Sequence, residues 1–179
     1  MTGLERRTIK ANGIRINLWA GGNGPPVLLL HGWPQTAQLW HKIAPQLAEH
    51  YTVVCPDLRG YGDSDKPRDG YDKKTMARDM HELMRALGHE RYALIGHDRG
   101  GRVGHRQALD YPDAVTRLCV VWAGGDKADE KALQKTISAQ RKAPDAPILL
   151  MDWTSDSRAV EKYVSAGTVQ LVQPEDPCK

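Results

Sequence analysis

An aspartate flanked by glycines is the part of the sequence best suited to chemistry. Asp98 lies in the pattern Gly96-x-Asp98-x-Gly100, between a short apolar run at residues 92–95 and a run with helical periodicity. Such glycines permit a sharp strand-to-helix turn that lifts one side chain clear of a sheet. A carboxylate presented in this way can attack an sp³ carbon and form an ester with it. The alternative is that Asp98 only caps the following helix through its first-turn amides.

Two arginines follow Asp98 at a spacing that suits the binding of an anion. Arg99 and Arg102 are three residues apart, so on a helix they share one face and converge beside Asp98. A guanidinium group grips a carboxylate at two points, which favours a substrate with a carboxylate next to the carbon that is attacked. The alternative is that one or both arginines form structural ion pairs with Asp57 or Asp110.

The elements that must position these residues alternate between strands and helices. Short apolar or alternating runs predict strands at residues 7–10, 14–19, 27–30, 52–55, 92–95, 118–121, 148–151 and 168–172. Helical spacing is found at residues 39–47 with a kink or restart at Pro45, at 76–87 with Gly88 as its C-cap, after Asp98, and more weakly at 126–142. This order predicts an α/β fold with a doubly wound, mostly parallel sheet.

Length and composition favour one domain over residues 1–179, with 40% hydrophobic residues for its core. The net charge of +3 comes from interspersed charges without a long basic run, so nucleic acid is not expected as a partner. No segment approaches the ~20 apolar residues of a membrane span or resembles a signal peptide, and a cytoplasmic location is predicted. No metal-ligand spacing occurs, so neither a metal nor another cofactor is expected. The sequence leaves homodimer formation open.

Three motifs in the same order resemble the α/β-hydrolase superfamily and, within it, the haloacetate (fluoroacetate) dehalogenases. They are HGWPQ from His31, DLRGYGDSDKP from Asp57 and GHDRGGRVGHR from Gly96. The resemblance covers residues 1–121, whereas residues 122–179 diverge. It implies an α/β-hydrolase fold in which Asp98 displaces halide from a short 2-halocarboxylic acid such as haloacetate or fluoroacetate, the expected small-molecule partner.

The elbow architecture also assigns roles to the residues around Asp98. The backbone N–H groups of Trp33 and Arg99 are expected to stabilise the oxyanion that forms when water cleaves the aspartyl ester. The side chains of Arg99 and Arg102 are expected to bind the carboxylate of the substrate, an assignment that the resemblance also implies.

Several further residues are expected to support the site. His31 would shape the loop that carries Trp33 and take no part in the chemistry. Asp57 belongs to a loop that braces the site floor, and Asp57, Arg59 and Asp63 are expected to pair with one another. His97 precedes the nucleophile on the strand, so its side chain is expected to point to the opposite side as a hydrogen-bonded packing residue.

The last third of the chain departs from the resemblance. Residues 122–125 stand where an acid that orients the catalytic histidine is usual, and Asp126, Asp152 or Asp156 are candidates to replace it. The helical cap domain is expected to be absent or reduced to the weak helix at residues 127–142, and the C-terminus to be shortened.

The general base is missing from its expected position. All seven histidines lie between His31 and His105, whereas the resemblance places the catalytic histidine beyond Val172. We therefore hypothesise a truncated, chimeric or designed relative that forms the aspartyl ester at most once, so that turnover is impaired. The alternatives are an epoxide hydrolase, which uses the same elbow with two cap tyrosines, and a catalytically inactive α/β-hydrolase-like binding protein.

Overall fold

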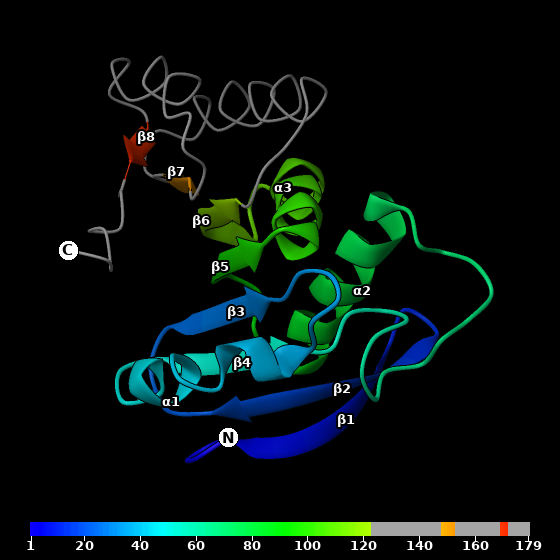
Figure 1. Cartoon of the computed structure of the whole chain (residues 1–179), viewed down its shortest axis with the longest axis horizontal. Helices are drawn as coiled ribbons and strands as arrows, with labels where there is room; N and C mark the ends of the chain where they lie inside the picture. The colour runs from blue at the N-terminus through cyan, green and yellow to red at the C-terminus, as the bar shows by residue number, and fades with distance from the viewer. Residues whose placement is uncertain (123–147, 153–168, 172–179) are drawn as a thin grey trace.

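The computed structural model describes residues 1–122, 148–152 and 169–171, which form one eight-stranded sheet (Figure 1). The strands are β1 (Glu5–Ala11), β2 (Ile14–Gly21), β3 (Pro26–Leu30), β4 (Thr52–Pro56), β5 (Tyr92–His97), β6 (Val115–Trp122), β7 (Ile148–Asp152) and β8 (Val169–Leu171). The helices are the 3₁₀ helix η1 (Ala37–Trp40) and the α-helices α1 (Ala44–Leu47), α2 (Lys73–Ala86) and α3 (Arg99–Asp110). All eight strands predicted from the sequence are present.

The sheet has the order β1-β2-β4-β3-β5-β6-β7-β8. β1, β2 and β4 pair antiparallel, and β4, β3 and β5 to β8 pair parallel, so the predicted mostly parallel α/β sheet is confirmed. The opening hairpin turns at Asn12 and Gly13, whose φ angles of 45° and 81° are both positive. Two positive φ angles match the right-handed twist of the paired strands, which is why an Asn-Gly pair is favoured there.

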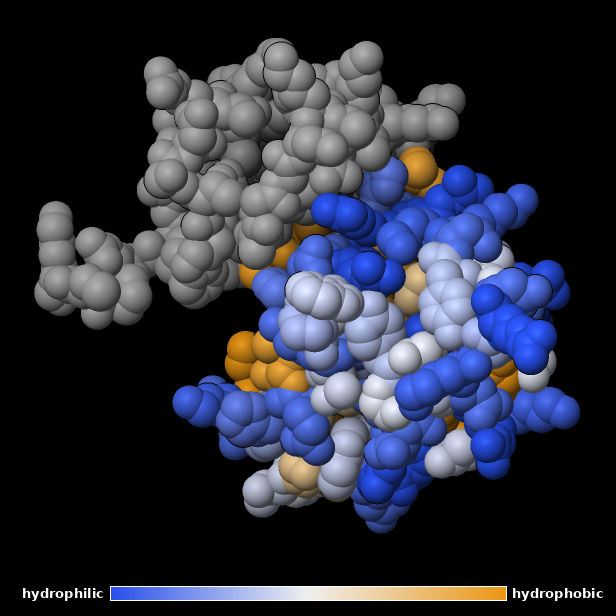
Figure 2. Space-filling view, turned by 45° about the vertical axis from the view of Figure 1, so that its right-hand side comes forward, coloured by the Kyte–Doolittle hydropathy of each residue, from blue (hydrophilic) through white to orange (hydrophobic). Residues whose placement is uncertain are grey.

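Helices cover both faces of the sheet, as the predicted doubly wound arrangement requires (Figure 1). One hydrophobic cluster joins α2 and α3 to the sheet, and a second joins η1 and α1 to the other face. Helix α2 buries the predicted stripe of Met76, Met80, Leu83 and Met84, and Gly88 follows its end with a φ of 84°. The surface seen in Figure 2 is mostly hydrophilic with small apolar areas, because the large aliphatic side chains are inside.

The predicted helix at residues 39–47 is divided in two. The 3₁₀ helix ends at Trp40, and α1 begins at Ala44 with Pro45 in its first turn. Proline has no N–H to donate, and the first turn is the part of a helix where that donor is not needed. The expected restart at Pro45 is therefore confirmed. The weak helix predicted at 126–142 lies outside the described residues.

Within the described residues, none of the helices combines the length and the apolar character needed to cross a membrane.

A buried ion pair fixes α2 to the loop after β4. The Arg59 guanidinium donates to both carboxylate oxygens of Asp79, Nε to Oδ2 at 2.7 Å and Nη2 to Oδ1 at 2.7 Å, and the two side chains are 6% and 0% exposed. Asn12 Nδ2 adds a third hydrogen bond to Asp79 at 2.6 Å. The pair thus joins the loop, the helix and the first turn of the chain.

The expected pairing of Asp57, Arg59 and Asp63 with one another is wrong. Arg59 pairs with Asp79 because that carboxylate is buried on α2 and needs a cation. Asp63 forms an exposed pair with Arg6, and only its backbone N–H donates to Asp57.

We predict that Asp79→Asn lowers the free energy of unfolding by about 3–5 kcal/mol, because it leaves the Arg59 charge buried without a counter-charge. Asp63→Asn is the control, since its pair with Arg6 is exposed and contributes about 1 kcal/mol or less. Urea denaturation of both variants measures the difference. Equal losses for the two variants would contradict the assigned role of the buried pair.

Candidate active site

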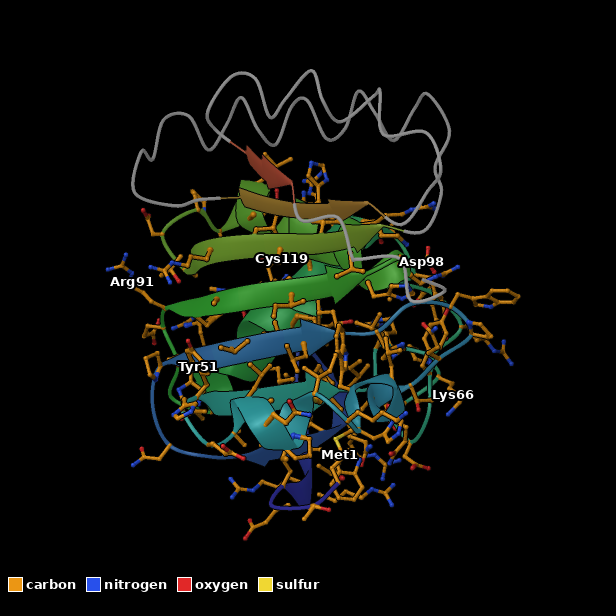
Figure 3. The ribbon with its side chains drawn as sticks, turned by 60° about the vertical axis from the view of Figure 1, so that its left-hand side comes forward. Met1, Tyr51, Lys66, Arg91, Asp98 and Cys119 are labelled. Atoms are coloured by element: carbon orange, nitrogen blue, oxygen red, sulfur yellow. The ribbon has the colours of Figure 1, made fainter. Side chains whose placement is uncertain are left out.

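The residues predicted to do chemistry meet at the carboxyl ends of two neighbouring parallel strands. β3 and β5 pair in register, with Leu30 opposite Gly96. The loop that carries His31, Gly32 and Trp33 therefore leaves the sheet beside Asp98. Figure 3 shows Asp98 at the carboxyl end of β5. Loops at the carboxyl ends of parallel strands are the usual position of active sites in α/β proteins.

Asp98 has a strained backbone. Its φ of 46° and ψ of −111° lie outside the regions that non-glycine residues normally adopt, at a cost of about 1–3 kcal/mol. Hydrogen bonds on both sides hold this conformation, from Asp98 N to Val121 O at 3.1 Å and from Arg102 N to Asp98 O at 3.1 Å. The backbone turns sharply from β5 into α3, so the residue forms an elbow.

The glycines around Asp98 are required by close packing. A Cβ atom on Gly100 would lie 2.3 Å from Leu30 O and 2.6 Å from His31 O, both in the backbone of the neighbouring strand and loop. A Cβ on Gly96 would lie 2.5 Å from Gly100 O. A side chain at Gly100 would push the elbow away from the loop that faces it, and one at Gly96 would push the end of β5 away from the first turn of α3.

The Asp98 carboxylate faces that loop and does not cap α3. Its side chain makes no capping hydrogen bond to the helix, and Oδ2 accepts instead from the backbone N–H of Trp33 at 2.9 Å. The capping alternative is therefore wrong. Trp33 is 63% exposed, and its contact with Asp98 is made by its backbone N–H.

His31 holds the loop in place. It is fully buried, its Nδ1 lies 2.8 Å from Gly32 O, and its Nε2 accepts from Leu58 N at 3.0 Å. These partners require a neutral ring with the proton on Nδ1. Burial lowers the pKa of His31, which favours the same neutral form.

Asp57 braces the segment that follows the loop. Its carboxylate accepts from Ala37 N at 2.8 Å, from Asn17 Nδ2 at 2.8 Å and from Asp63 N at 3.0 Å. Asp57 thus connects η1, β2 and its own loop beneath the site.

The two arginines lie beside Asp98 on α3. Arg99 is half-buried and Arg102 is exposed. The two acids considered as structural partners are engaged elsewhere: Asp110 accepts from Arg106 Nε at 2.8 Å, and Asp57 accepts from the groups described above. The Arg99 guanidinium lies over the ring of Tyr61, with Cζ 5.7 Å from the ring centroid.

Lys73 is a third cation near the site that sequence reasoning missed. It is half-buried at the start of α2, and burial together with the charges of Arg99 and Arg102 lowers its pKa. The Asp98 carboxylate acts on it in the opposite direction. No local spacing links Lys73 to α3, because the packing of α2 against α3 brings them together.

His97 differs from its expected place. A Cβ on Gly32 would lie 2.8 Å from His97 Nδ1 and 2.9 Å from Asp98 Oδ2, so both side chains abut the same glycine. Within the described part of the chain, His97 Nδ1 is buried without a hydrogen-bond partner. The expectation of a hydrogen-bonded packing residue on the opposite side is wrong, because the alternation of a strand does not continue into the elbow.

Comparison with known proteins agrees with this architecture. The alpha/beta hydrolase fold family matches residues 25–147. The chain belongs to this family. Asp98 lies at the turn from β5 into α3, the position at which hydrolases of this fold carry their nucleophile. Of the three candidate orienting acids, Asp152 is the last residue of β7, opposite Trp122 on β6. Asp126, Asp156 and the region of the expected cap lie outside the described residues.

Individual relatives divide between two activities. The chain is 54% identical over 124 residues to a fluoroacetate dehalogenase from Burkholderia sp, a match that covers 66% of this chain and 41% of the relative. It is 49% identical over 120 residues to a soluble epoxide hydrolase from Corynebacterium sp. (strain C12), covering 67% and 42%. The matched region thus spans about two fifths of the length of these curated relatives.

The chain is also similar to a solved structure. A Pseudomonas aeruginosa protein provisionally assigned as an epoxide hydrolase, in its Q244E mutant form, aligns with a TM-score of 0.79 at 28% identity. The alignment covers 98% of this chain and 89% of that chain.

We predict that Gly100→Ala lowers the free energy of unfolding by about 2 kcal/mol more than Gly104→Ala. Both changes gain similar helix propensity on α3. The added methyl group at Gly100 meets rigid backbone at Leu30, whereas at Gly104 it meets the end of the Leu94 side chain at 2.4 Å, which can move. Urea denaturation provides the comparison. Equal stability of the two variants would show that the elbow and the facing loop are not tightly packed.

We also predict that the free energy of unfolding decreases as the pH falls below about 6.5, the ordinary pKa of histidine. Below that pH, His31 binds a proton in the unfolded chain but stays neutral in the folded chain, where burial lowers its pKa. The free energy of unfolding therefore keeps decreasing until the pH drops below the lowered pKa of His31. In His31→Gln this part of the pH dependence disappears, whereas His50→Gln, which replaces an exposed ring, serves as the control. Urea denaturation at several pH values tests this, and an unchanged profile in His31→Gln would contradict it.

Proposed function

We propose that Asp98 displaces halide from a short 2-halocarboxylic acid, such as fluoroacetate or another haloacetate, through an aspartyl-ester intermediate. The observation that supports this best is the hydrogen bond from Trp33 N to Asp98 Oδ2 in the strained elbow. This hydrogen bond orients the carboxylate away from the helix and towards the loop after β3. The 54% identity to a fluoroacetate dehalogenase supports the choice of substrate.

The first step is a substitution at carbon. Because Trp33 N–H holds Oδ2, Oδ1 of Asp98 is the oxygen that attacks the carbon bearing the halogen. The new carbon–oxygen bond forms as the carbon–halogen bond breaks, and the halide leaves with the bonding electrons. The product is an ester between Asp98 and the substrate carbon.

The second step is hydrolysis of that ester at the aspartate's own carbonyl carbon. Water adds to Cγ, and the negative charge develops on Oδ2. The Trp33 N–H is already within 2.9 Å of that atom, and we propose the backbone N–H of Arg99 as the second donor. The Cγ–Oδ1 bond then breaks and the 2-hydroxy acid leaves with Oδ1, which receives the proton that a general base takes from the water. This step needs such a base. The segment after β8, where the family resemblance places it, lies outside the described residues, and the hypothesis of a single turnover stays a prediction.

Arg99 and Arg102 are proposed to bind the carboxylate of the substrate. Both follow Asp98 on α3, and Lys73 adds positive potential at the same place. A carboxylate held there presents its α-carbon to Asp98, which raises the effective concentration of the reacting atoms. The proposed small-molecule partner is therefore an anion. One domain over residues 1–179 and a cytoplasmic location accompany this proposal.

Epoxide hydrolysis is the second candidate, supported by the 49% identity to a soluble epoxide hydrolase. An aspartate elbow can open an epoxide by the same attack on carbon. The substrate is then neutral, so the cationic surroundings of Asp98 would contribute nothing to its binding. The arginines therefore favour the haloacid. A catalytically inactive binding protein is the third candidate.

The test is covalent labelling of the chain by chloroacetate and, separately, by styrene oxide. We predict a carboxymethyl group on Asp98, located by peptide mass spectrometry, with release of one chloride per chain, and no labelling of Asp98→Asn. Arg99→Gln should weaken the apparent affinity for chloroacetate about ten- to hundredfold, because a charge-assisted hydrogen bond is lost.

Arg106→Gln is the matched control for Arg99→Gln, since Arg106 lies on the same helix and pairs with Asp110. It should react like the unmodified chain. Preferential labelling by styrene oxide would favour the epoxide hydrolase, and labelling by neither reagent would favour the binding protein. Equal labelling of Asp98→Asn would contradict the proposed nucleophile.

A further inference from the structure

Tyr61 connects the loop of His31 to Arg99 on α3, yet no role in the site is assigned to it above. Its half-buried ring contacts the His31 ring edge to face, with centroids 5.1 Å apart and planes at 68°. The Arg99 guanidinium lies over the same ring, with Cζ 5.7 Å from the centroid. This distance is within the range in which a cation is attracted to the face of an aromatic ring.

The Tyr61 ring is itself held firmly. Tyr61 N donates to Leu58 O at 2.9 Å, and Leu58 N donates to His31 Nε2 at 3.0 Å. The His31 imidazole therefore fixes the turn that begins at Leu58 and also contacts the ring at its end. The Tyr61 side chain packs against the main hydrophobic cluster. A rigid aromatic surface is thus presented to Arg99.

Arg99 benefits from such a surface because, among the described residues, no hydrogen bond or ion pair orients its guanidinium. A half-buried arginine has several rotatable bonds, and its freedom must be lost before it can hold a carboxylate at two points. Arg102 follows on the same helix face, and Lys73 interacts electrostatically with both arginines. Repulsion between these cations favours positions of Arg99 away from the others, including ones unsuited to a substrate. Attraction to the Tyr61 ring counteracts this.

We propose that Tyr61 is a positioning residue that holds the Arg99 guanidinium for the substrate carboxylate and links it, through His31, to the loop that supplies the Trp33 N–H. The inference rests on the proposed function, in which Arg99 binds a haloacid. The His31 imidazole then supports both the Tyr61 ring beside Arg99 and the loop that supplies the oxyanion donor. Because Tyr61 itself contacts Arg99, replacing Tyr61 is expected to change mainly the affinity for the substrate anion.

The test compares Tyr61→Leu, which removes the aromatic face, with Tyr61→Phe, which keeps it. Labelling of Asp98 by chloroacetate gives an apparent dissociation constant and a maximal rate. We expect Tyr61→Leu to raise the dissociation constant about three- to tenfold, as expected for the loss of a cation–π contact, and to change the maximal rate less than about twofold. Tyr61→Phe should remain within about twofold of the unmodified chain in both quantities.

Tyr111→Leu is the matched control. Tyr111 is also half-buried, packs against the same hydrophobic cluster and stacks on a histidine, His81, at 3.8 Å between centroids. Its loss should reduce stability without changing the dissociation constant for chloroacetate. A rise as large as that of Tyr61→Leu, or no rise in Tyr61→Leu, would overturn the proposal.

Proton NMR separates this proposal from the proposed function and does not depend on labelling. A guanidinium held over the ring places the Arg99 side-chain protons in the ring current of Tyr61, so their signals should be shifted upfield and the shift should persist in Tyr61→Phe. Its absence in the unmodified chain would overturn the proposal even if Tyr61→Leu fails to fold. An upfield shift without labelling by chloroacetate would instead refute the proposed function alone.

Discussion

The hydrogen bond between Trp33 N and Asp98 Oδ2 is the contact on which the site depends. It joins the loop after β3 to the elbow after β5 across 2.9 Å, and it forms only because the two strands are parallel neighbours in register. The absence of side chains at Gly32 and Gly100 allows the loop and the elbow to approach. A strained backbone at Asp98 then directs the carboxylate to the donor.

This arrangement is stabilised from below by polar groups that are themselves satisfied. His31 and Asp57 are buried and use their hydrogen-bonding atoms on backbone groups of the surrounding loops. The ion pair of Arg59 and Asp79 fixes the next segment to α2. The strain at Asp98, about 1–3 kcal/mol, is therefore carried by a scaffold in which His31, Asp57 and the Arg59–Asp79 pair all have partners, which explains how an unfavourable conformation persists in the folded chain.

Much of this could be predicted from the sequence because it depends on local patterns. Apolar runs showed all eight strands, and the spacing of Gly96, Asp98 and Gly100 showed the elbow. Contacts set by the packing of distant elements could not be predicted. Arg59 pairs with Asp79, and not with the expected Asp57 or Asp63, because Asp79 is buried on α2. Lys73 and Tyr61 come close to Arg99 only because the chain folds in this way. The prediction for His97 is wrong for a related reason, because the alternation of side chains along β5 ends at the elbow.

The distinction between haloacids and epoxides lies in the cations beside Asp98, but both reactions share the attack of the Asp98 carboxylate on carbon. The most direct test of that shared step is a single turnover of chloroacetate in water enriched in ¹⁸O, followed by mass spectrometry of the peptide that contains Asp98. Our account predicts a carboxymethyl ester that stays on Asp98 or, where that ester is hydrolysed, label in the Asp98 carboxylate, and in both cases no label in the glycolate hydroxyl. Label in the glycolate hydroxyl and none in Asp98 would mean that water attacks the substrate directly, and would contradict the account.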